Sequence, residues 1–314
     1  MRILVFNAGS SSLKFGVFRI GSAETHLFKG SFERFRDGGC DFRFATCADG
    51  RSIAGRAGHA DLAAAIAAVP GVLADHGFDG LDAIGHRVVH GGAVHAAPVR
   101  IDDAMLAELE SLTPLAPLHN PANIAGIRLA RSVWPDLPQI GVFDTAFHLT
   151  APPFATTYAV PEAWRTAGLR RFGFHGTSHK YVALRAAEVI GQPLDRLLVV
   201  SCHLGNGASV CAINRGRSMD TSMGLTPLEG LVMGTRSGDV DPGAFGYLSR
   251  RLGLGIDEIE AALYNDSGLK ALTGSSDMRD VEERAAAGDA AAQLAIEVYA
   301  YRARKYIGAY AGAM

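Results

Sequence analysis

One pattern occurs twice in the sequence and sharply limits the fold: an apolar run, a loop of small polar residues, and a second apolar run. In the first copy residues 2–6 and 15–20 flank the loop 7–14, and in the second residues 197–202 and 210–213 flank the loop 203–209. Runs rich in Val, Ile and Phe on both sides of such a loop favour paired β-strands. We therefore predict two β-hairpins of similar design.

Strand and helix patterns alternate along the rest of the chain. Residues 83–89 and 139–143 have the composition of strands, whereas residues 61–69, 102–112, 120–134, 178–190 and 290–314 have apolar side chains near helical spacing. Pro70 and Gly191 are expected to end two of these helices. The mixed order predicts an α/β architecture. Because 314 residues favour two domains, we place a boundary in the Pro-containing segment 150–153, which gives domains of residues 1–150 and 151–314 with a cleft between them.

Composition excludes several classes of function. The formal charge of −2 gives no broad field for binding nucleic acid or an anionic membrane. The four cysteines lack the spacing of a zinc site, and a disulfide framework is implausible in a chain of this length, so we expect them to be reduced. The N-terminal apolar run is too short for a signal peptide, and apolar runs stay below the roughly 18 residues of a membrane span. We expect a cytoplasmic protein.

The loop 7–14 is longer than a hairpin needs, and phosphate binding would explain its length. The chain has no GxxxxGK[ST] motif, and Gly205 and Gly207 precede strand-like residues rather than the helix of a dinucleotide site. In a loop of small residues, backbone N–H groups can approach phosphate oxygens, Asn7 can offer an oxygen to Mg²⁺, and Lys14 adds a cation. The alternative interpretation is a flexible surface loop.

Two arginines are presented beside glycines. Arg87 lies in HRVVHGG and Arg236 lies in GTRSGD. A guanidinium group suits phosphate or carboxylate oxygens, and the glycines leave space for a ligand. The alternative for either arginine is a salt bridge to an acidic residue.

A histidine and an aspartate complete the candidate set. His175 lies just before a helix that Thr177 or Ser178 could cap, where it could donate to a phosphoryl group or satisfy a backbone group. Asp144 follows the predicted strand 139–143, where it could orient a metal-bound water or cap a helix. The eleven histidines show no ligand spacing with the cysteines, so zinc is not predicted.

Eight segments in order resemble the acetate kinase family: NAGSSSLKF, HRVVHGG, PLHNP, FDTAFH, RFGFHGTSH, HLGNGAS, TSMGLTPLEG and GTRSGDVDPG. The resemblance extends from residue 2 to residue 314. It implies the actin and sugar-kinase (ribonuclease H-like) fold, in which two related α/β domains close over ATP, and it implies a homodimer. The second domain would be the nucleotide-binding one.

The resemblance also implies roles for individual residues. Those for ATP are Ser10, Ser12 and Lys14 in the first hairpin and His203, Gly205, Asn206 and Gly207 in the second, with Asn7 at the metal. The catalytic residues would be Arg87, Asp144, His175 and Arg236, and the apolar pocket for the acetate methyl group would be Val89, Leu118, Phe174 and Pro227. Mg²⁺ or Mn²⁺ would be the cofactor and ATP or ADP the co-substrate.

The implied reaction is the reversible transfer of a phosphoryl group between ATP and acetate, which gives acetyl phosphate and ADP. One methylene group is worth only ~1–3 kcal/mol in an apolar pocket, so propionate or butyrate kinase stays an alternative. The family continues beyond the counterpart of Met314 with a Gly-rich adenosine segment, a metal-binding Glu and a final helix. We therefore expect a C-terminally truncated member, and a nucleotide- or phosphate-binding module without turnover is a further alternative.

Overall fold

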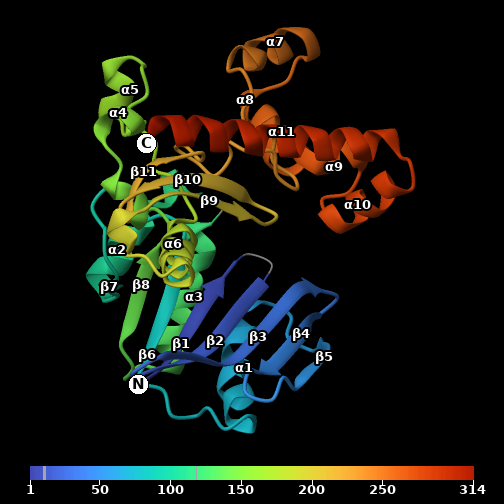
Figure 1. Cartoon of the computed structure of the whole chain (residues 1–314). Coiled ribbons are helices and arrows are strands. Elements are labelled where there is room, and N and C mark those ends of the chain that lie inside the picture. Colours follow the sequence, from blue (N-terminus) through green and yellow to red (C-terminus); the bar gives the residue numbers. More distant parts are fainter. Residues whose placement is uncertain (10–11, 118) are drawn as a thin grey trace. The chain divides into compact units, whose positions relative to one another are not determined.

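The computed structural model of the chain describes residues 1–9, 12–117 and 119–314. The chain forms two compact units, Met1–Ala146 and Phe147–Met314, and each is described by itself. Both units contain helices and strands, which confirms the predicted α/β class (Figure 1). These units are defined by packing alone, so the division into functional domains at residue 150 stays a prediction.

The first unit is built on a sheet that has eight strands in the described part of the chain, in the order β5-β4-β3-β2-β1-β6-β8-β7. The strands are β1 (Arg2–Ala8), β2 (Ser12–Ile20), β3 (Glu24–Arg36), β4 (Gly39–Thr46), β5 (Ser52–Ala57), β6 (Ala83–Val88), β7 (Val99–Arg100) and β8 (Gln139–Phe143). Strands β1 to β5 pair antiparallel in chain order, whereas β1, β6 and β8 are parallel neighbours. The carboxyl ends of these three parallel strands therefore lie at one edge of the sheet.

Helices α1 (Leu62–Asp75), α2 (Asp103–Ser111) and α3 (Asn120–Val133), with the 3₁₀ turn Thr113–Leu115, complete the first unit. Asp61 and Asp102 cap α1 and α2 by accepting from backbone N–H groups. Phe6, Phe28 and Phe32 are at most 1% exposed in the core between the sheet and its helices. Burial of a side chain of this size contributes ~1.5–3 kcal/mol, so Phe6 anchors the predicted strand β1, and Phe28 and Phe32 anchor β3.

Helix α1 does not end before Pro70, so that prediction was wrong. It continues to Asp75 with Pro70 inside it. Proline inside a helix costs ~3 kcal/mol, but Val69 and Leu73, one turn apart on the buried face, are 0% and 2% exposed. Burial of two such side chains, at ~1.5–3 kcal/mol each, is large enough to offset that cost.

Both predicted hairpins are present, but their loops are shorter than predicted. Strand β1 runs to Ala8 and β2 begins at Ser12, so Asn7 and Lys14 are opposite each other in the ladder instead of lying in a loop of residues 7–14. In the second hairpin His203 and Ser209 are likewise paired. Ladder pairing satisfies the backbone groups of these polar residues. Because small polar residues are typical of loops, the sequence did not indicate that they belong to strands.

The second unit contains a sheet with the order β11-β10-β9, formed by β9 (Leu198–Leu204), β10 (Ala208–Asn214) and β11 (Arg217–Thr221). Its helices are α4 (Pro153–Thr156), α5 (Glu162–Thr166), α6 (Gly176–Ile190), α7 (Gly243–Leu252), α8 (Ile256–Asn265), α9 (Gly268–Thr273), α10 (Met278–Ala286) and α11 (Ala290–Ala313), with 3₁₀ turns Ala146–Thr150 and Leu194–Arg196. Helices α6 and α11 flank the sheet (Figure 1). Gly191 adopts a left-handed conformation at the end of α6, as the sequence predicted.

Two further properties of the described residues concern membrane spans and cysteine pairing. None of their helices is both long and apolar enough to cross a membrane. None of the four cysteines forms a disulfide in this structure.

Candidate functional site

The first unit gathers Asn7, Arg87 and Asp144 at the carboxyl ends of β1, β6 and β8. Nε of Arg87 donates to both carboxylate oxygens of Asp144, at 3.0 and 3.1 Å, and Nη2 donates to Oδ2 at 2.5 Å. Nη1 donates to Oδ1 of Asn7 at 3.0 Å. The parallel register β1–β6–β8 brings these side chains together from positions far apart in the sequence. Strand ends of this kind are common ligand sites in α/β sheets.

Arg87 is held as a permanently charged group. Its side chain is 34% exposed, whereas that of Asp144 is 1% exposed. Burial opposes the charged form of Arg87, but Asp144 beside it outweighs burial and raises the pKa of Arg87. The salt-bridge alternative for Arg87 is therefore realised in this structure, and the partner orients the plane of the guanidinium.

Two asparagines of α3 fix the segment that follows β6. Oδ1 of Asn123 accepts from the N–H of Val89 at 2.9 Å, and its Nδ2 donates to the carbonyl of Ala8 at 2.7 Å. Oδ1 of Asn120 accepts from the N–H of His90 at 3.1 Å. These bonds tie the ends of β1 and β6 to one helix. Sequence reasoning gave neither asparagine a role, although Asn120 lies in the segment PLHNP that resembles the family.

Ser12 and Lys14, the other residues proposed for the first hairpin that the structure describes, lie at the start of β2. Nζ of Lys14 lies 3.4 Å from the carboxylate of Glu33, in an exposed ion pair. The backbone carbonyl of Ser12 accepts from the N–H of Gly9 at 2.8 Å. Ser10 and Leu118 lie outside the described residues. Phosphate binding by this hairpin stays a prediction.

In the second unit His175 immediately precedes α6, with a left-handed backbone at φ 58°. The predicted caps were wrong, because the helix begins at Gly176 and no side-chain cap is present. Ser178 instead lies in the first turn, and its Oγ is 2.9 Å from Nδ1 of His203. The rings of His175 and His203 stack with centroids 4.0 Å apart. The start of α6 is thus tied to β9.

Arg236 and His175 both border the space above Gly207. A Cβ atom added to Gly207 would lie 3.3 Å from Nη1 of Arg236 and 3.6 Å from Nε2 of His175. Nη1 also donates to the carbonyl of Pro227 at 3.1 Å, which fixes the direction of the guanidinium. Two nitrogen-bearing side chains therefore converge on a backbone position that glycine keeps open.

A cavity of about 610 Å³ adjoins the second hairpin loop. Its lining includes Gly205, Asn206 and Gly234, together with Asp277 and Met278 at the start of α10. An added Cβ at position 234 would lie 2.1 Å from Oδ1 of Asn206, so any larger residue there would displace the Asn206 side chain. The α10 residues were not predicted from sequence, since they lie about seventy positions after the loop.

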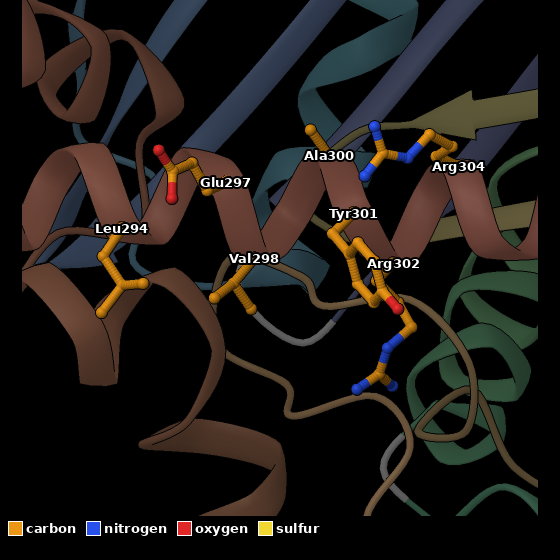
Figure 2. Close-up of a pocket in the computed structure, with 7 residues that line it drawn as sticks. All are labelled: Leu294, Glu297, Val298, Ala300, Tyr301, Arg302 and Arg304. Atoms are coloured by element: carbon orange, nitrogen blue, oxygen red, sulfur yellow. The ribbon is translucent and has the colours of Figure 1, made fainter.

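A second hollow, of about 730 Å³, runs along α11 (Figure 2). Its lining residues, Leu294, Glu297, Val298, Ala300, Tyr301, Arg302 and Arg304, all belong to that helix. Arg302 extends to the carbonyl of Gly230, at 3.2 Å, and to the carboxylate of Asp239, also at 3.2 Å. Helix α11 therefore braces the segment between β11 and α7, from which Arg236 projects.

The apolar-pocket residues are placed in different units. Val89 belongs to the first unit and is 7% exposed. Phe174, 1% exposed, and Pro227 belong to the second, where Phe174 precedes His175 and Pro227 accepts from Arg236. A common pocket for a methyl group stays a prediction.

Asn7 and Asp144 carry the oxygens at these strand ends that suit a divalent cation, and Arg87 occupies part of their acceptor capacity. Oδ1 of Asn7 already accepts from a guanidinium, and both oxygens of Asp144 face Arg87. No group of three or more His, Cys, Asp or Glu side chains among residues 1–9, 12–117 and 119–314 is arranged to hold a metal ion. Mg²⁺ commonly binds through water and substrate phosphates instead.

Comparison with known proteins assigns these features to a family. The chain matches the model of the Acetokinase family over residues 2–314. It is 48% identical to the acetate kinase of a Geobacillus species, over 100% of this chain and 80% of that relative. Its structure is similar to the propionate kinase of Francisella tularensis (TM-score 0.94, 41% identity) and the acetate kinase of Porphyromonas gingivalis (TM-score 0.90, 40% identity), in each case over 100% of this chain and 80% of the other.

The chain thus spans about four fifths of the length of these relatives. The agreement in fold confirms the actin and sugar-kinase class that the resemblance implied. By sequence over residues 2–314 and by fold, the chain belongs to the Acetokinase family.

Proposed function

We propose that the chain is an acetate kinase, which transfers a phosphoryl group reversibly between ATP and acetate. The observation that carries the proposal is the convergence of Arg236 and His175 on the open position above Gly207. Family membership supports an ATP-dependent phosphotransferase with a carboxyl group as acceptor. Nucleotide binding alone would not require both an arginine and a histidine at one such position.

The chemistry needs alignment and charge neutralisation more than a base. A short carboxylic acid with a pKa near ~4 is already ionised at neutral pH. An acetate oxygen forms a bond to the γ-phosphorus as the bond to the bridging oxygen breaks, and ADP leaves with that electron pair. Negative charge spreads over the phosphoryl oxygens. Arg236 and His175 would oppose this charge, and Arg87, oriented by Asp144, would hold acetate or phosphate oxygens.

The nucleotide would approach the second hairpin. Backbone N–H groups of Gly205, Asn206 and Gly207 suit phosphate oxygens because small side chains let them come close. The cavity of about 610 Å³ beside this loop has room for the rest of the nucleotide. His203, stacked on His175, would border the phosphates. Ser12 and Lys14 would contribute from the first hairpin.

The metal and the assembly belong to the proposal as well. Mg²⁺ or Mn²⁺ would arrive with the nucleotide and reduce the charge of its phosphates. Asn7, whose side-chain oxygen also accepts from Arg87, would offer that oxygen to the metal or to one of its bound waters. Homodimer formation and a cytoplasmic location are further parts of the proposal, which rest on resemblance to the family. Acetate is proposed over propionate and butyrate because relatives that are 48% identical to this chain are named acetate kinases.

The test is formation of acyl phosphate from Mg-ATP, trapped with hydroxylamine, with acetate, propionate and butyrate compared at equal concentration. We expect the highest kcat/KM with acetate, and loss of the signal in Arg236→Ala, prepared in parallel to exclude contaminating kinases. Higher kcat/KM with propionate would reassign the substrate. If none of the three acids gave an acyl phosphate, the acyl kinase proposal would fail.

A further inference from the structure

Beneath His175 lies a buried line of alternating serine and histidine side chains. Oγ of Ser209 is 2.9 Å from Nδ1 of His175 and 2.8 Å from Nε2 of His179. Nδ1 of His179 is in turn 2.7 Å from Oγ of Ser201. The chain of contacts therefore reads Ser201–His179–Ser209–His175.

The hairpin and α6 create this line. Ser201 and Ser209 lie on the face of the sheet that packs against α6, because Ser201 is paired with Cys211 and Ser209 with His203. His179 is one helical turn after His175, so both rings lie on the same side of α6. The backbone carbonyl of His175 accepts from the N–H of His179 at 2.9 Å.

The middle of the line is dry and uncharged. Ser209, His179 and Ser201 are 0%, 1% and 4% exposed. Burial, reinforced by the neighbouring histidines 148, 175 and 203, lowers the pKa of His179 to about 2. Near neutral pH His179 is therefore a neutral imidazole, which has one N–H and one bare nitrogen.

Each serine hydroxyl and each neutral imidazole in the line has one proton to donate. The three hydrogen bonds can therefore all point in either of two directions along the line. In the first, Ser201 donates to His179 Nδ1, His179 donates from Nε2 to Ser209, and Ser209 donates to His175 Nδ1. In the second direction every bond is reversed, and His175 donates from Nδ1. The first direction leaves the proton of a neutral His175 on Nε2, the atom that borders the space above Gly207. The second leaves Nε2 of a neutral His175 as an acceptor, which would face a phosphoryl anion unfavourably.

We propose that Ser209, backed by His179 and Ser201, is a positioning residue that holds His175 in the tautomer with its proton on Nε2. The inference rests on the proposed function, because it gives His175 a phosphoryl group to donate to. Ser209 does not touch the reacting atoms. It binds Nδ1 of His175, which keeps Nε2 beside Gly207, and the phosphoryl group then selects the direction in which Nε2 donates.

The same unit contains a matched control. Nε2 of His148 donates to the carbonyl of Phe174 at 2.9 Å, so its Nδ1, 2.8 Å from Oγ of Ser218, accepts. Ser218, at 0% exposed, is as buried as Ser209 but contacts His148 instead of His175. Loss of a buried hydroxyl from either serine should affect stability similarly.

The experiment measures ¹⁵N shifts of the histidine rings in the full chain, with the His175 signals assigned from His175→Gln. Protonated and bare ring nitrogens are well separated in such spectra. In the wild-type chain we expect the proton on Nε2 of His175. In Ser209→Ala we expect both tautomers, with kcat for acetate lower by about tenfold, the size expected for one lost hydrogen bond, and KM values unchanged. Ser218→Ala should leave the His175 shifts and kcat as in the wild type.

A wild-type His175 with its proton on Nδ1, or Ser209→Ala with unaltered His175 shifts, would overturn the inference. The wild-type spectrum decides the tautomer even if Ser209→Ala does not fold. The ring shifts need no turnover, so absence of acyl phosphate formation would count against the proposed function alone. Equal loss of kcat in Ser209→Ala and Ser218→Ala would show a merely structural effect and would also overturn the inference.

Discussion

Arg87 donates hydrogen bonds from Nε and Nη2 to the carboxylate of Asp144 and from Nη1 to the side-chain oxygen of Asn7. The N–O distances lie between 2.5 and 3.1 Å. Asp144 is 1% exposed, and Arg87 is the more exposed partner. A forked pair of this kind restricts the guanidinium to one plane. It therefore presents the remaining N–H groups of Arg87 in a fixed direction.

Removal of Arg87 should destabilise the chain through Asp144. In Arg87→Ala the carboxylate stays buried without its guanidinium partner, and breaking a buried pair in this way costs about 3–5 kcal/mol. Urea unfolding measures the loss. The double variant Arg87→Ala, Asp144→Ala should recover part of it, since the buried charge is gone. A single variant as stable as the wild type would show that the pair does not contribute to the fold.

Replacement of Arg236 should separate catalysis from stability. In Arg236→Ala we expect turnover to fall by about 10³-fold or more, the range for an arginine that stabilises a transferred phosphoryl group. The lost contacts include a hydrogen bond to Pro227, worth about 1 kcal/mol, and the contact of the guanidinium with the ring of Tyr264. Arg250→Ala, at an exposed position on α7, is the matched control and should keep full turnover. Near-normal turnover in Arg236→Ala would remove Arg236 from the mechanism.

An added methyl group at Gly234 should weaken nucleotide binding. Its Cβ would lie 2.1 Å from Oδ1 of Asn206, so the side chain of Asn206, which lines the cavity proposed for the nucleotide, must move. Calorimetric titration with ADP should show weaker binding in Gly234→Ala. Gly308→Ala, where the added Cβ meets no atom within 4 Å, should bind ADP as the wild type does. Unchanged affinity in Gly234→Ala would place the nucleotide elsewhere.

Acid should destabilise the first unit through its buried histidines. Burial lowers the pKa of His86 to about 4, against a smaller opposing effect of Gln139, and burial also lowers the pKa of His90 to about 4. Between pH 6.5 and 4 the unfolded chain binds protons that the folded chain excludes. The free energy of unfolding therefore falls as the pH falls, by at most about 1.4 kcal/mol per pH unit for each histidine.

Urea unfolding at pH 7, 6 and 5 tests this dependence. The double variant His86→Leu, Gln139→Leu removes one of the two groups together with its partner, and its slope should be lower by up to about 1.4 kcal/mol per pH unit. Equal slopes for the variant and the wild type would show that the folded chain binds a proton at His86 as readily as the unfolded chain does.

Local pattern predicted the elements whose apolar runs are buried. Strands β1, β2, β6, β8, β9 and β10 and helices α2, α3, α6 and α11 were all predicted from sequence, to within a few residues. Strands β3 to β5 were missed. In β5 every residue except the last is exposed. Its sequence therefore lacks the alternation of apolar and polar residues that indicates a half-buried strand. Pro70 misled the prediction of α1, because tertiary burial outweighed its local cost.

The candidate site residues were chosen one by one from the sequence, which did not show the contacts among them. Arg87 and Asp144 were singled out from the sequence, yet their pairing depends on the parallel register of β6 and β8, which no local pattern encodes. His179 and Ser209 were overlooked for a similar reason. The helical spacing of His179 from His175 was visible, whereas the approach of Ser209 required the packing of α6 on the hairpin.

Phosphoryl transfer itself is tested without any variant by ³¹P NMR of the purified chain with Mg-ATP and acetate. We predict that the resonance of acetyl phosphate appears together with that of ADP, and that ATP forms when acetyl phosphate and Mg-ADP are supplied instead. Release of inorganic phosphate alone, or no change in either direction, would contradict the claim that this chain transfers a phosphoryl group between ATP and acetate.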